Sequence, residues 1–459
     1  MLYQRDWTVK IGYAPTRRRM YDIKYALDNK RAIRQEMEKL GAGRVEIVDI
    51  DWLNDEGLLI DPADVPAVAR RFREAGVDAV VIAHVNFGSE EVVPLLGKAL
   101  GVPVLLWGPR DTAPEGIGPR QTDIQCGLFA SGKGLVRYGV PFTYIENCRL
   151  EDEPFQRGFV DFVRVASAAR EFRRMRIGQI NTRPKPFQSV MVNESELIEK
   201  FGIEVVPMST TDIAWQAEKL LASHPGDVAQ MVADIESKVD CSAMDAEDIR
   251  KIAAVELAAL QAAKQHGLTA MASECWSTFR QTMGIGVCFV FGDLTDRGLP
   301  TACETDIHGA VTSALAHAAA MGDTVPFLAD LTVRHPTNDN AELLWHCGPF
   351  PQQLARDPAD RKIVEYKGYW EIKGGDITIA RFDGVRGEYK LFAGQARGVD
   401  GPVTNGNYVW AEVNDWPAWE RKFVTGPYIH HVTGLHGKYV PIFQELTKYL
   451  GPVEFDTVE

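Results

Sequence analysis

The sequence predicts an α/β protein, in which two doubly wound, Rossmann-like α/β domains precede a β-rich, antiparallel and barrel-like C-terminal domain. Three observations support this class. A chain of 459 residues is too long for one ordinary hydrophobic core. Short apolar runs alternate with helical patterns over the first two thirds of the chain. After about residue 326, apolar and polar residues alternate with the period of antiparallel strands.

The first domain is expected at residues 1–172. Four apolar runs are predicted as its strands: 9–15, 45–51, 79–85 and 102–108. Helical patterns fill the intervals, and near-continuous Val and Ile runs separated by helices indicate parallel strands buried on both faces. No GxGxxG follows the first run, so dinucleotide binding is unsupported.

The second domain is expected at residues 173–325 and the third at residues 326–459. A long charged helix at 153–174 leads into RIGQINTRP, which reads as a new first strand, and helices follow at 211–222 and 246–266. The last third contains Gly-, Asn- and Pro-punctuated strands and closes with a helix at 440–449.

The composition excludes several classes of protein. A net charge of −13 disfavours a nucleic-acid surface, and no apolar run is long enough to cross a bilayer. The first residues lack a signal-peptide pattern, so a cytoplasmic protein is expected. The seven cysteines are scattered without a CxxC pair, which argues against a disulfide framework or a thiolate zinc site.

The stretch PTACETDIHGAV, residues 300–311, concentrates acidic and imidazole groups where a strand is expected to end and a helix to begin. Ligand sites of open α/β sheets usually lie at such places. Asp306 also suits an ordinary helix cap. Glu304 has no such role, and a buried carboxylate there would be costly without a cation or a strong hydrogen-bond partner.

Further polar residues interrupt apolar strands downstream. They are Asp330 in VPFLADLTV, His346 in ELLWHCG, and His430 and His431 in YIHHVTG. Asp330 could equally end a strand, and a lone buried histidine is usually a satisfied core residue. Two carboxylates with one or two imidazoles nevertheless suit Mn²⁺ or another divalent ion such as Mg²⁺.

Four motifs together resemble the L-fucose isomerase and L-arabinose isomerase superfamily, and its fucose branch more closely. They are IGYAPTRRR, ACETDIHGAV, FLADLTV and HHVTGLHG, in the family's order along nearly the whole chain. The resemblance implies that Glu304, Asp330 and His431 bind the metal. A histidine ligand of the arabinose branch corresponds to His346.

The resemblance also implies an aldose–ketose isomerase, in which an enediolate forms as a proton moves between C1 and C2 of an open-chain hexose. Glu304 and Asp330 are then the catalytic acid–base candidates. Asp306, His308 and His346 would orient the metal ligands. The family further implies a homo-oligomer such as a hexamer, with a neighbouring subunit's first domain covering a site between the second and third domains.

The identity of the sugar stays open, because the chain is shorter between motifs than typical fucose isomerases. A neutral sugar needs an apolar wall, for which Trp276 and Trp345 are candidates. A sulfonated sugar such as sulfoquinovose needs cations, and these could come from Arg17, Arg18, Arg19 or Arg334. His430 is a further candidate substrate contact.

Two alternatives to this interpretation remain. The arginine cluster at 17–19 is more often an ordinary solvated patch. The whole chain could also be a non-catalytic sugar-binding or regulatory protein on the isomerase fold.

Overall fold

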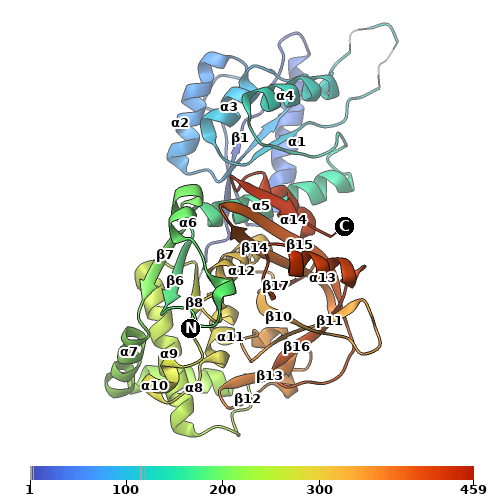
Figure 1. Cartoon of the computed structure of the whole chain (residues 1–459). Coiled ribbons are helices and arrows are strands. Elements are labelled where there is room, and N and C mark those ends of the chain that lie inside the picture. Colours follow the sequence, from blue (N-terminus) through green and yellow to red (C-terminus); the bar gives the residue numbers. More distant parts are fainter. Residues whose placement is uncertain (1–2, 4, 114–115, 119, 459) are drawn as a thin grey trace. The chain divides into compact units, whose positions relative to one another are not determined.

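The computed structural model describes residues 3, 5–113, 116–118 and 120–458 (Figure 1). It divides into two compact units. Asp6–Arg170 form the smaller unit, and Glu171–Glu459 with the first residues of the chain form the larger one. Both combine helices with sheets, so the predicted α/β class is confirmed. The boundary expected at residue 326 falls inside the larger unit and stays a prediction.

The smaller unit contains a five-stranded parallel sheet in the order β2-β1-β3-β4-β5. Its strands are β1 (Val9–Tyr13), β2 (Val45–Val48), β3 (Ala79–Ala83), β4 (Val104–Trp107) and β5 (Thr143–Tyr144). Its helices are η1 (Pro62–Asp64), α1 (Ile23–Gly41), α2 (Val65–Ala75), α3 (Val92–Leu100), α4 (Ile124–Tyr138) and most of α5 (Glu153–Arg173). The chain leaves β1 in one direction to β2 and then crosses to β3 on the other side, which makes the sheet doubly wound.

The four strands predicted for this unit are all present, and the expected burial on both faces holds for the strands at the centre of the sheet. Every residue of β3 and β4 is buried. Close packing also explains Gly12 in β1, where a Cβ would lie 2.7 Å from the ring of Phe72.

The larger unit begins with a four-stranded parallel sheet in the order β7-β6-β8-β9. Its strands are β6 (Arg176–Ile180), β7 (Glu204–Met208), β8 (Ala270–Ser273) and β9 (Thr301–Ala302). The helices of this part are η2 (Gln188–Val190), α6 (Glu194–Phe201), α7 (Thr210–Ser223), α8 (Pro225–Glu236), α9 (Ala246–His266), α10 (Thr278–Met283), α11 (Cys288–Asp296) and α12 (Ile307–Ala320). The winding direction reverses between β6 and β8, and ligands of such sheets bind beyond the carboxyl ends of the strands at that point.

A nine-stranded mixed sheet follows, in the order β12-β13-β16-β11-β10-β17-β14-β15-β18. The strands are β10 (Phe327–Arg334), β11 (Ala341–His346), β12 (Lys362–Val364), β13 (Lys367–Glu371), β14 (Gly375–Val385), β15 (Glu388–Val399), β16 (Asn407–Glu412), β17 (His431–His436) and β18 (Val453–Asp456). Its helices are η3 (Gln352–Leu354), η4 (Pro358–Asp360), α13 (Trp416–Thr425) and α14 (Val440–Thr447). An additional β15–β16 pairing closes β16, β11, β10, β17, β14 and β15 into a ring.

Helix α12 joins the two sheets of the larger unit (Figure 1). All of its residues are buried, and it packs against β8 and β9 on one side and against β14 and β17 on the other. Its sequence, IHGAVTSALAHAAA, is rich in small side chains, which lets both sheets approach its backbone closely. The N-terminus of α12 therefore lies where residues of both sheets can meet.

Among the described residues, no helix combines the length and apolar character needed to cross a membrane.

Candidate active site

Three strands of the larger unit bring the predicted metal ligands together. Glu304 follows β9, Asp330 lies within β10, and His431 is the first residue of β17. Strands β10 and β17 pair antiparallel with Asp330 directly opposite His431. On the other side of β10, Asp330 pairs with Trp345, the residue before His346.

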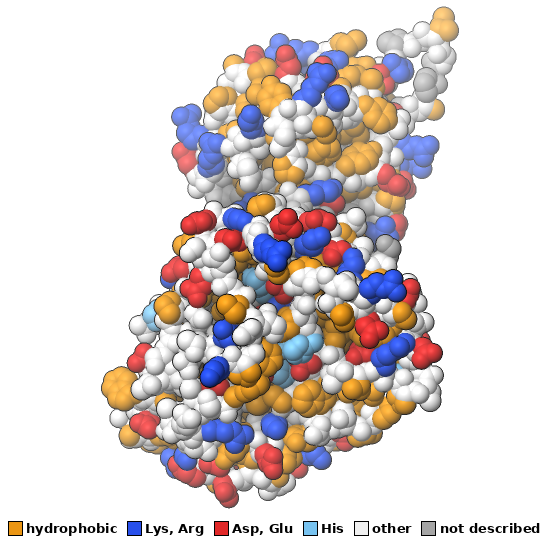
Figure 2. Space-filling view, viewed as in Figure 1, with side chains coloured by type: hydrophobic (Ala, Val, Ile, Leu, Met, Phe, Trp, Pro, Cys, Tyr) orange, Lys and Arg blue, Asp and Glu red, His pale blue; other side chains and the backbone are white. Residues whose placement is uncertain are grey.

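The side chains of Glu304, Asp330, His346 and His431 form what we call the central cluster. The Nε2 atom of His431 lies 3.4 Å from Asp330 Oδ1 and 3.9 Å from Glu304 Oε2. The Nε2 atom of His346 lies 3.6 Å from Glu304 Oε2 and 4.0 Å from Asp330 Oδ1. Glu304, His346 and His431 are buried, and Asp330 is partly exposed. Figure 2 shows histidine side chains beside acidic ones at the surface of this unit.

Several buried atoms of the central cluster have no hydrogen-bond partner among the described residues. They are Glu304 Oε2, Asp330 Oδ1 and His346 Nε2. Native proteins leave few buried polar atoms unpaired, and an ion is one explanation for those that remain. Carboxylate oxygens with imidazole nitrogens are ligands that suit Mn²⁺. The residues of the central cluster therefore fit a divalent cation.

Asp306 orients His431 from behind. Its Oδ2 atom lies 2.9 Å from His431 Nδ1, which leaves Nε2 of the ring to face the cluster. Arg381 holds Asp306 through two bonds, of 2.5 and 3.1 Å. Burial would raise the pKa of Asp306, but Arg381 and His431 hold that pKa far below its usual range. Asp306 also caps α12 by accepting a bond from the Gly309 amide, so the carboxylate has both of the roles considered from the sequence.

His308 lies one step further from the cluster. Its Nδ1 atom is 2.9 Å from Asp383 Oδ1, and Asp383 in turn accepts a 2.9 Å bond from Arg381 Nε. His308 therefore contacts the central cluster only through Asp383, Arg381 and Asp306.

The backbone around Glu304 has an unusual conformation. Glu304 and Thr305 have φ angles of 53° and 56°. Non-glycine residues in the left-handed region are uncommon and concentrate at functional sites. The turn points the Glu304 carboxylate so that Oε1 accepts a 3.0 Å bond from Trp276 Nε1, while Oε2 faces the imidazoles.

The carboxylates and imidazoles of the central cluster shift one another's pKa values. Burial would raise the pKa of Glu304, but the His346 and His431 imidazoles hold it below its ordinary value. Burial would lower the pKa of His346, but the Asp330 carboxylate and the neighbouring Cys347 raise it well above its ordinary value. The carboxylates of the cluster therefore favour the protonated, positively charged form of His346.

Thiols gather behind Glu304, although the sequence argued against a thiolate site. All seven cysteines are free. Cys275 Sγ lies 3.8 Å from Glu304 Oε1, and Cys347 Sγ lies 3.4 Å from Cys288 Sγ. Ligand atoms of Cys275, Cys303 and Glu304 lie within 4.8 Å of one another, close enough to hold one metal ion together. The grouping was not visible in the sequence because these cysteines come from four separate segments.

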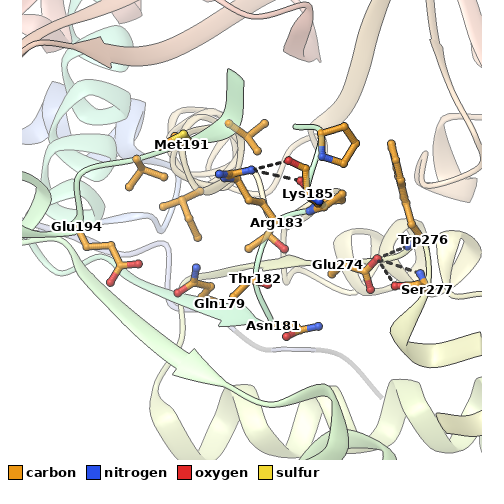
Figure 3. A pocket seen from close by; sticks show the side chains of 16 residues that line it. Gln179, Asn181, Thr182, Arg183, Lys185, Met191, Glu194, Glu274, Trp276 and Ser277 are labelled. Atoms are coloured by element: carbon orange, nitrogen blue, oxygen red, sulfur yellow. Dashed lines mark hydrogen bonds between the residues drawn. The ribbon is translucent and has the colours of Figure 1, made fainter. Parts of the chain in front are cut away.

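A cavity of about 740 Å³ is lined by Trp276 and Thr305, and the four side chains of the central cluster are not among its lining residues (Figure 3). The loop after β6 and the loop after β8 line it, together with Thr305, Ile307 and the start of α6. Trp276 and Thr305 connect it to Glu304, since one is bonded to that carboxylate and the other follows it in the chain. Phe187, in the loop after β6, has its ring centroid 5.4 Å from Trp276 and 5.6 Å from His431.

Comparisons with known proteins show which proteins the chain resembles. Residues 12–173 match the family model of the fucose/sulfoquinovose isomerase N-terminal domain. Sulfoquinovose isomerase of Alkalicoccus urumqiensis is 24% identical over 333 residues, which are 71% of this chain and 73% of that protein. Sulfoquinovose isomerase of Priestia aryabhattai is 24% identical over 339 residues, which are 72% of this chain and 74% of that protein.

The chain is thus similar to the fucose and sulfoquinovose isomerases, through the family model over residues 12–173 and through relatives at 24% identity. The predicted resemblance is therefore confirmed, and so is the predicted class of enzyme, an aldose–ketose sugar isomerase. An ABC transporter solute-binding protein from Bacillus halodurans with bound myo-inositol aligns with 70% of this chain and 90% of its own, at 13% identity and a TM-score of 0.16. A likeness that weak carries no conclusion.

The remaining candidates in the larger unit of this isomerase lie at different distances from the cluster. His430 is 43% exposed, with Nε2 3.9 Å from Asp330 Oδ1. Trp345 stacks on His346 at 6.3 Å between ring centroids and donates to the Asn405 carbonyl. Arg334 is exposed and donates to the Asp339 carbonyl at 2.7 Å, and it is not among the residues that line the cavity.

The arginine cluster belongs to the smaller unit. Arg17 is buried and forms two bonds to Glu56, of 2.6 and 2.7 Å. Arg18 lies over the Phe87 ring, 3.8 Å from its centroid, and Arg19 is exposed. A role for these arginines in a partner's site stays a prediction.

Sequence reasoning missed two groups of residues. Arg381 and Asp383 lie on β14 and support the residues that hold the proposed metal ligands. In the sequence they could have been noticed as two charges at alternate positions in the apolar stretch ITIARFDGV. Arg183 and Lys185 line the cavity, and their signal was the position of TRPKP directly after a predicted first strand.

Proposed function

We propose that the protein is a metal-dependent isomerase that interconverts an open-chain aldose and its ketose by proton transfer between C1 and C2. The observation that carries this proposal is the set of unpartnered atoms, Glu304 Oε2, Asp330 Oδ1 and His346 Nε2, that face one another beside a cavity. A sugar-binding protein without chemistry would not need such a costly arrangement of buried polar groups.

The side chains that would hold Mn²⁺ or Mg²⁺ are those of Glu304, Asp330 and His431, with His346 facing the same point. When bound, the cation would polarise two neighbouring sugar oxygens and stabilise the negative charge of the enediolate. Asp306 and Arg381 would keep His431 in position, and Trp276 would keep Glu304 in position.

The reaction conserves all atoms and electrons within the sugar. The C–H bond at C2 of the aldose breaks, a C–H bond forms at C1, and the hydroxyl proton passes from O2 to O1. Each step needs a group that takes a proton and returns it. Glu304 and Asp330 are the proposed carriers, because each has an oxygen without a hydrogen-bond partner at the cluster. No organic cofactor is required by this chemistry.

We propose sulfoquinovose as the substrate. The relatives from Alkalicoccus and Priestia are sulfoquinovose isomerases that align with about three quarters of their own length. Sulfoquinovose is an anionic hexose whose open-chain form presents the aldehyde and hydroxyl that the mechanism needs.

The test is isomerase activity of the full chain on a panel of aldoses. Protein stripped with a chelator and reloaded with Mn²⁺ is incubated in D₂O with sulfoquinovose, L-fucose or D-arabinose, and the products are followed by NMR. We expect ketose formation and deuterium incorporation that require the added metal. Failure to convert any sugar, with sugar binding intact, would favour the non-catalytic alternative instead.

We also propose a homo-oligomer, which rests on the family resemblance. Light scattering on the eluted protein should give a mass that is a multiple of the 51.0 kDa chain. A single-chain mass across a range of concentrations would remove the idea that a neighbouring subunit completes the site.

A further inference from the structure

The loop after β6 forms one end of the cavity. Among the described residues, its two cationic side chains, Arg183 and Lys185, have no acidic partner. Arg183 and Lys185 both line the cavity, and among the described residues neither forms an ion pair. Lys185 is exposed, and Arg183 is half-buried. Figure 3 shows the two side chains next to each other.

Backbone carbonyls hold the Arg183 guanidinium in place. Its Nη1 atom donates to the carbonyls of Pro184, at 3.4 Å, and Lys185, at 3.2 Å. No partner is seen for Nε or Nη2 in the part of the chain that the structure describes. Nη1 therefore holds the Arg183 guanidinium in place, and the donors on Nε and Nη2 remain available to a ligand.

The acidic residues of the cavity do not neutralise this charge. Glu274 is buried and accepts bonds from the amides of Trp276, Ser277 and Thr278, at 2.8, 2.9 and 3.0 Å. Its carboxylate is thus used to cap α10. Glu194, at the start of α6, lies across the cavity from Arg183 in Figure 3.

The cavity also has a polar residue next to the central cluster. Thr305 lines the cavity and directly follows Glu304 in the chain. Among the described residues, its buried hydroxyl has no hydrogen-bond partner, and a sugar hydroxyl that reaches it would supply one.

We infer that Arg183 and Lys185 bind the anionic group at the far end of the sugar and so select a sulfonated hexose over its neutral counterpart. This inference rests on the proposed isomerase function. A sulfonate presents several acceptor oxygens, which match the fork of donors on a guanidinium and the point charge of an ammonium. The arginines considered from the sequence suit this task less well, because Arg17 is bonded to Glu56 and Arg334 lies outside the cavity lining.

The experiment compares two sugars that differ in the sulfonate alone. Arg183→Gln and Lys185→Gln are made in the full chain, loaded with Mn²⁺, and assayed with sulfoquinovose and with quinovose, which has hydrogen in place of the sulfonate. Loss of a charge-assisted hydrogen bond should lower kcat/KM for sulfoquinovose by roughly 10- to 100-fold. We expect the change to fall mainly on KM, with the value for quinovose unaltered.

Arg250→Gln is the matched control, because Arg250 is an exposed arginine of α9 whose partner is Glu247 and which does not line the cavity. It should behave as the wild type with both sugars. Calorimetric binding of sulfoquinovose to the Mn²⁺-loaded proteins provides a second readout when quinovose turnover is too slow to measure. Because Lys185 is exposed, Lys185→Gln should fold normally. It therefore tests the inference even if Arg183→Gln does not fold.

The outcomes separate this inference from the proposed function. Normal sulfoquinovose turnover and binding in both variants would overturn the role of Arg183 and Lys185 and leave the isomerase intact. An equal fall for sulfoquinovose and quinovose would also overturn it, because the residues would then shape the cavity without reading the charge. A wild-type protein that converts no sugar would refute the proposed function itself.

Discussion

The central cluster and the loop after β6 that carries Arg183 and Lys185, which we propose to be two ends of one site, are built in opposite ways. The cluster residues lie on strands or shortly after them. Trp276 holds Glu304 in position, and Asp306 holds His431 in position. Arg183 and Lys185 lie on the loop after β6, where Arg183 donates to the carbonyls of Pro184 and Lys185, and among the described residues neither side chain forms an ion pair. The comparison suggests that the chemistry is fixed by the fold, while the choice of sugar depends on a loop that can change without disturbing the sheets.

The largest effect is expected from removing a carboxylate of the cluster. Glu304→Gln keeps the size of the side chain but loses the charge that would bind the metal and carry a proton. Acid–base groups contribute about 10²- to 10⁴-fold to rates, so kcat should fall at least that far. NMR of deuterium exchange at C2 measures the loss.

Asp339→Asn is the matched control for the loss of a carboxylate. Asp339 is a fully exposed residue of the loop after β10, and its side chain lies only at the limit of an ion pair, 4.0 Å from Arg334. Its variant should exchange the C2 proton at the wild-type rate. Intact exchange in Glu304→Gln would remove the catalytic assignment.

A smaller effect is expected from the residues behind the ligands. Arg381→Gln leaves all four cluster side chains in the chain but removes the buried cation that holds Asp306. Loss of such a supporting partner typically costs 10- to 100-fold in metal affinity. Titration with Mn²⁺, followed by the electron paramagnetic resonance of the free ion, should show weaker binding.

Excess metal should then recover much of the activity of Arg381→Gln, whereas Glu304→Gln should not recover. This difference is one that a loss of folding would not produce. Mn²⁺ affinity equal to that of the wild type would show that Asp306 holds His431 without help from β14.

The smallest expected effect concerns Glu342, a buried glutamate outside the central cluster. Burial, with Glu420 nearby, raises the pKa of Glu342 in β11 to about 7, in contrast to the lowered pKa of Glu304. Because the folded pKa lies above the ordinary value of 4.5, Glu342 costs stability increasingly as the pH rises from about 4.5 through 7.

Glu342→Gln should therefore raise the apparent unfolding temperature at pH 8 and change it little at pH 4.5. Thermal unfolding followed by circular dichroism at both pH values checks this. An increase of the same size at both would mean that packing, and not ionisation, accounts for the change.

The sequence predicted the elements of this fold where local pattern decides them. Strands β1 to β4 of the smaller unit, the long helices at 153–173 and 246–266, and the closing helix α14 lie where periodicity placed them, whereas the short strand β5 was not predicted. Helix α13 was not predicted, because its WPAWERKF segment lies in a region of strand-like alternation. The β15–β16 pairing that closes the ring depends on contacts between strands, which no local pattern encodes.

The site was predictable to the extent that polar residues interrupted apolar strands. Glu304, Asp330, His346 and His431 stood out for that reason, and the structure brings them together. Arg381 was harder to find, because a charge in a strand is usually exposed and only the tertiary structure shows it buried against Asp306. Arg183 and Lys185 were missed because loop cations are common and only the cavity distinguishes these two.

The most direct test of the account is the metal content of the central cluster and its link to proton exchange. Wild-type protein freed of metal should bind one Mn²⁺ per chain, and C2 proton exchange in the sugar should return in proportion to the bound ion. His431→Gln should weaken both together. Full exchange in metal-free protein, or Mn²⁺ binding that is the same in His431→Gln and Glu304→Gln as in the wild type, would contradict the claim that these side chains hold the catalytic cation.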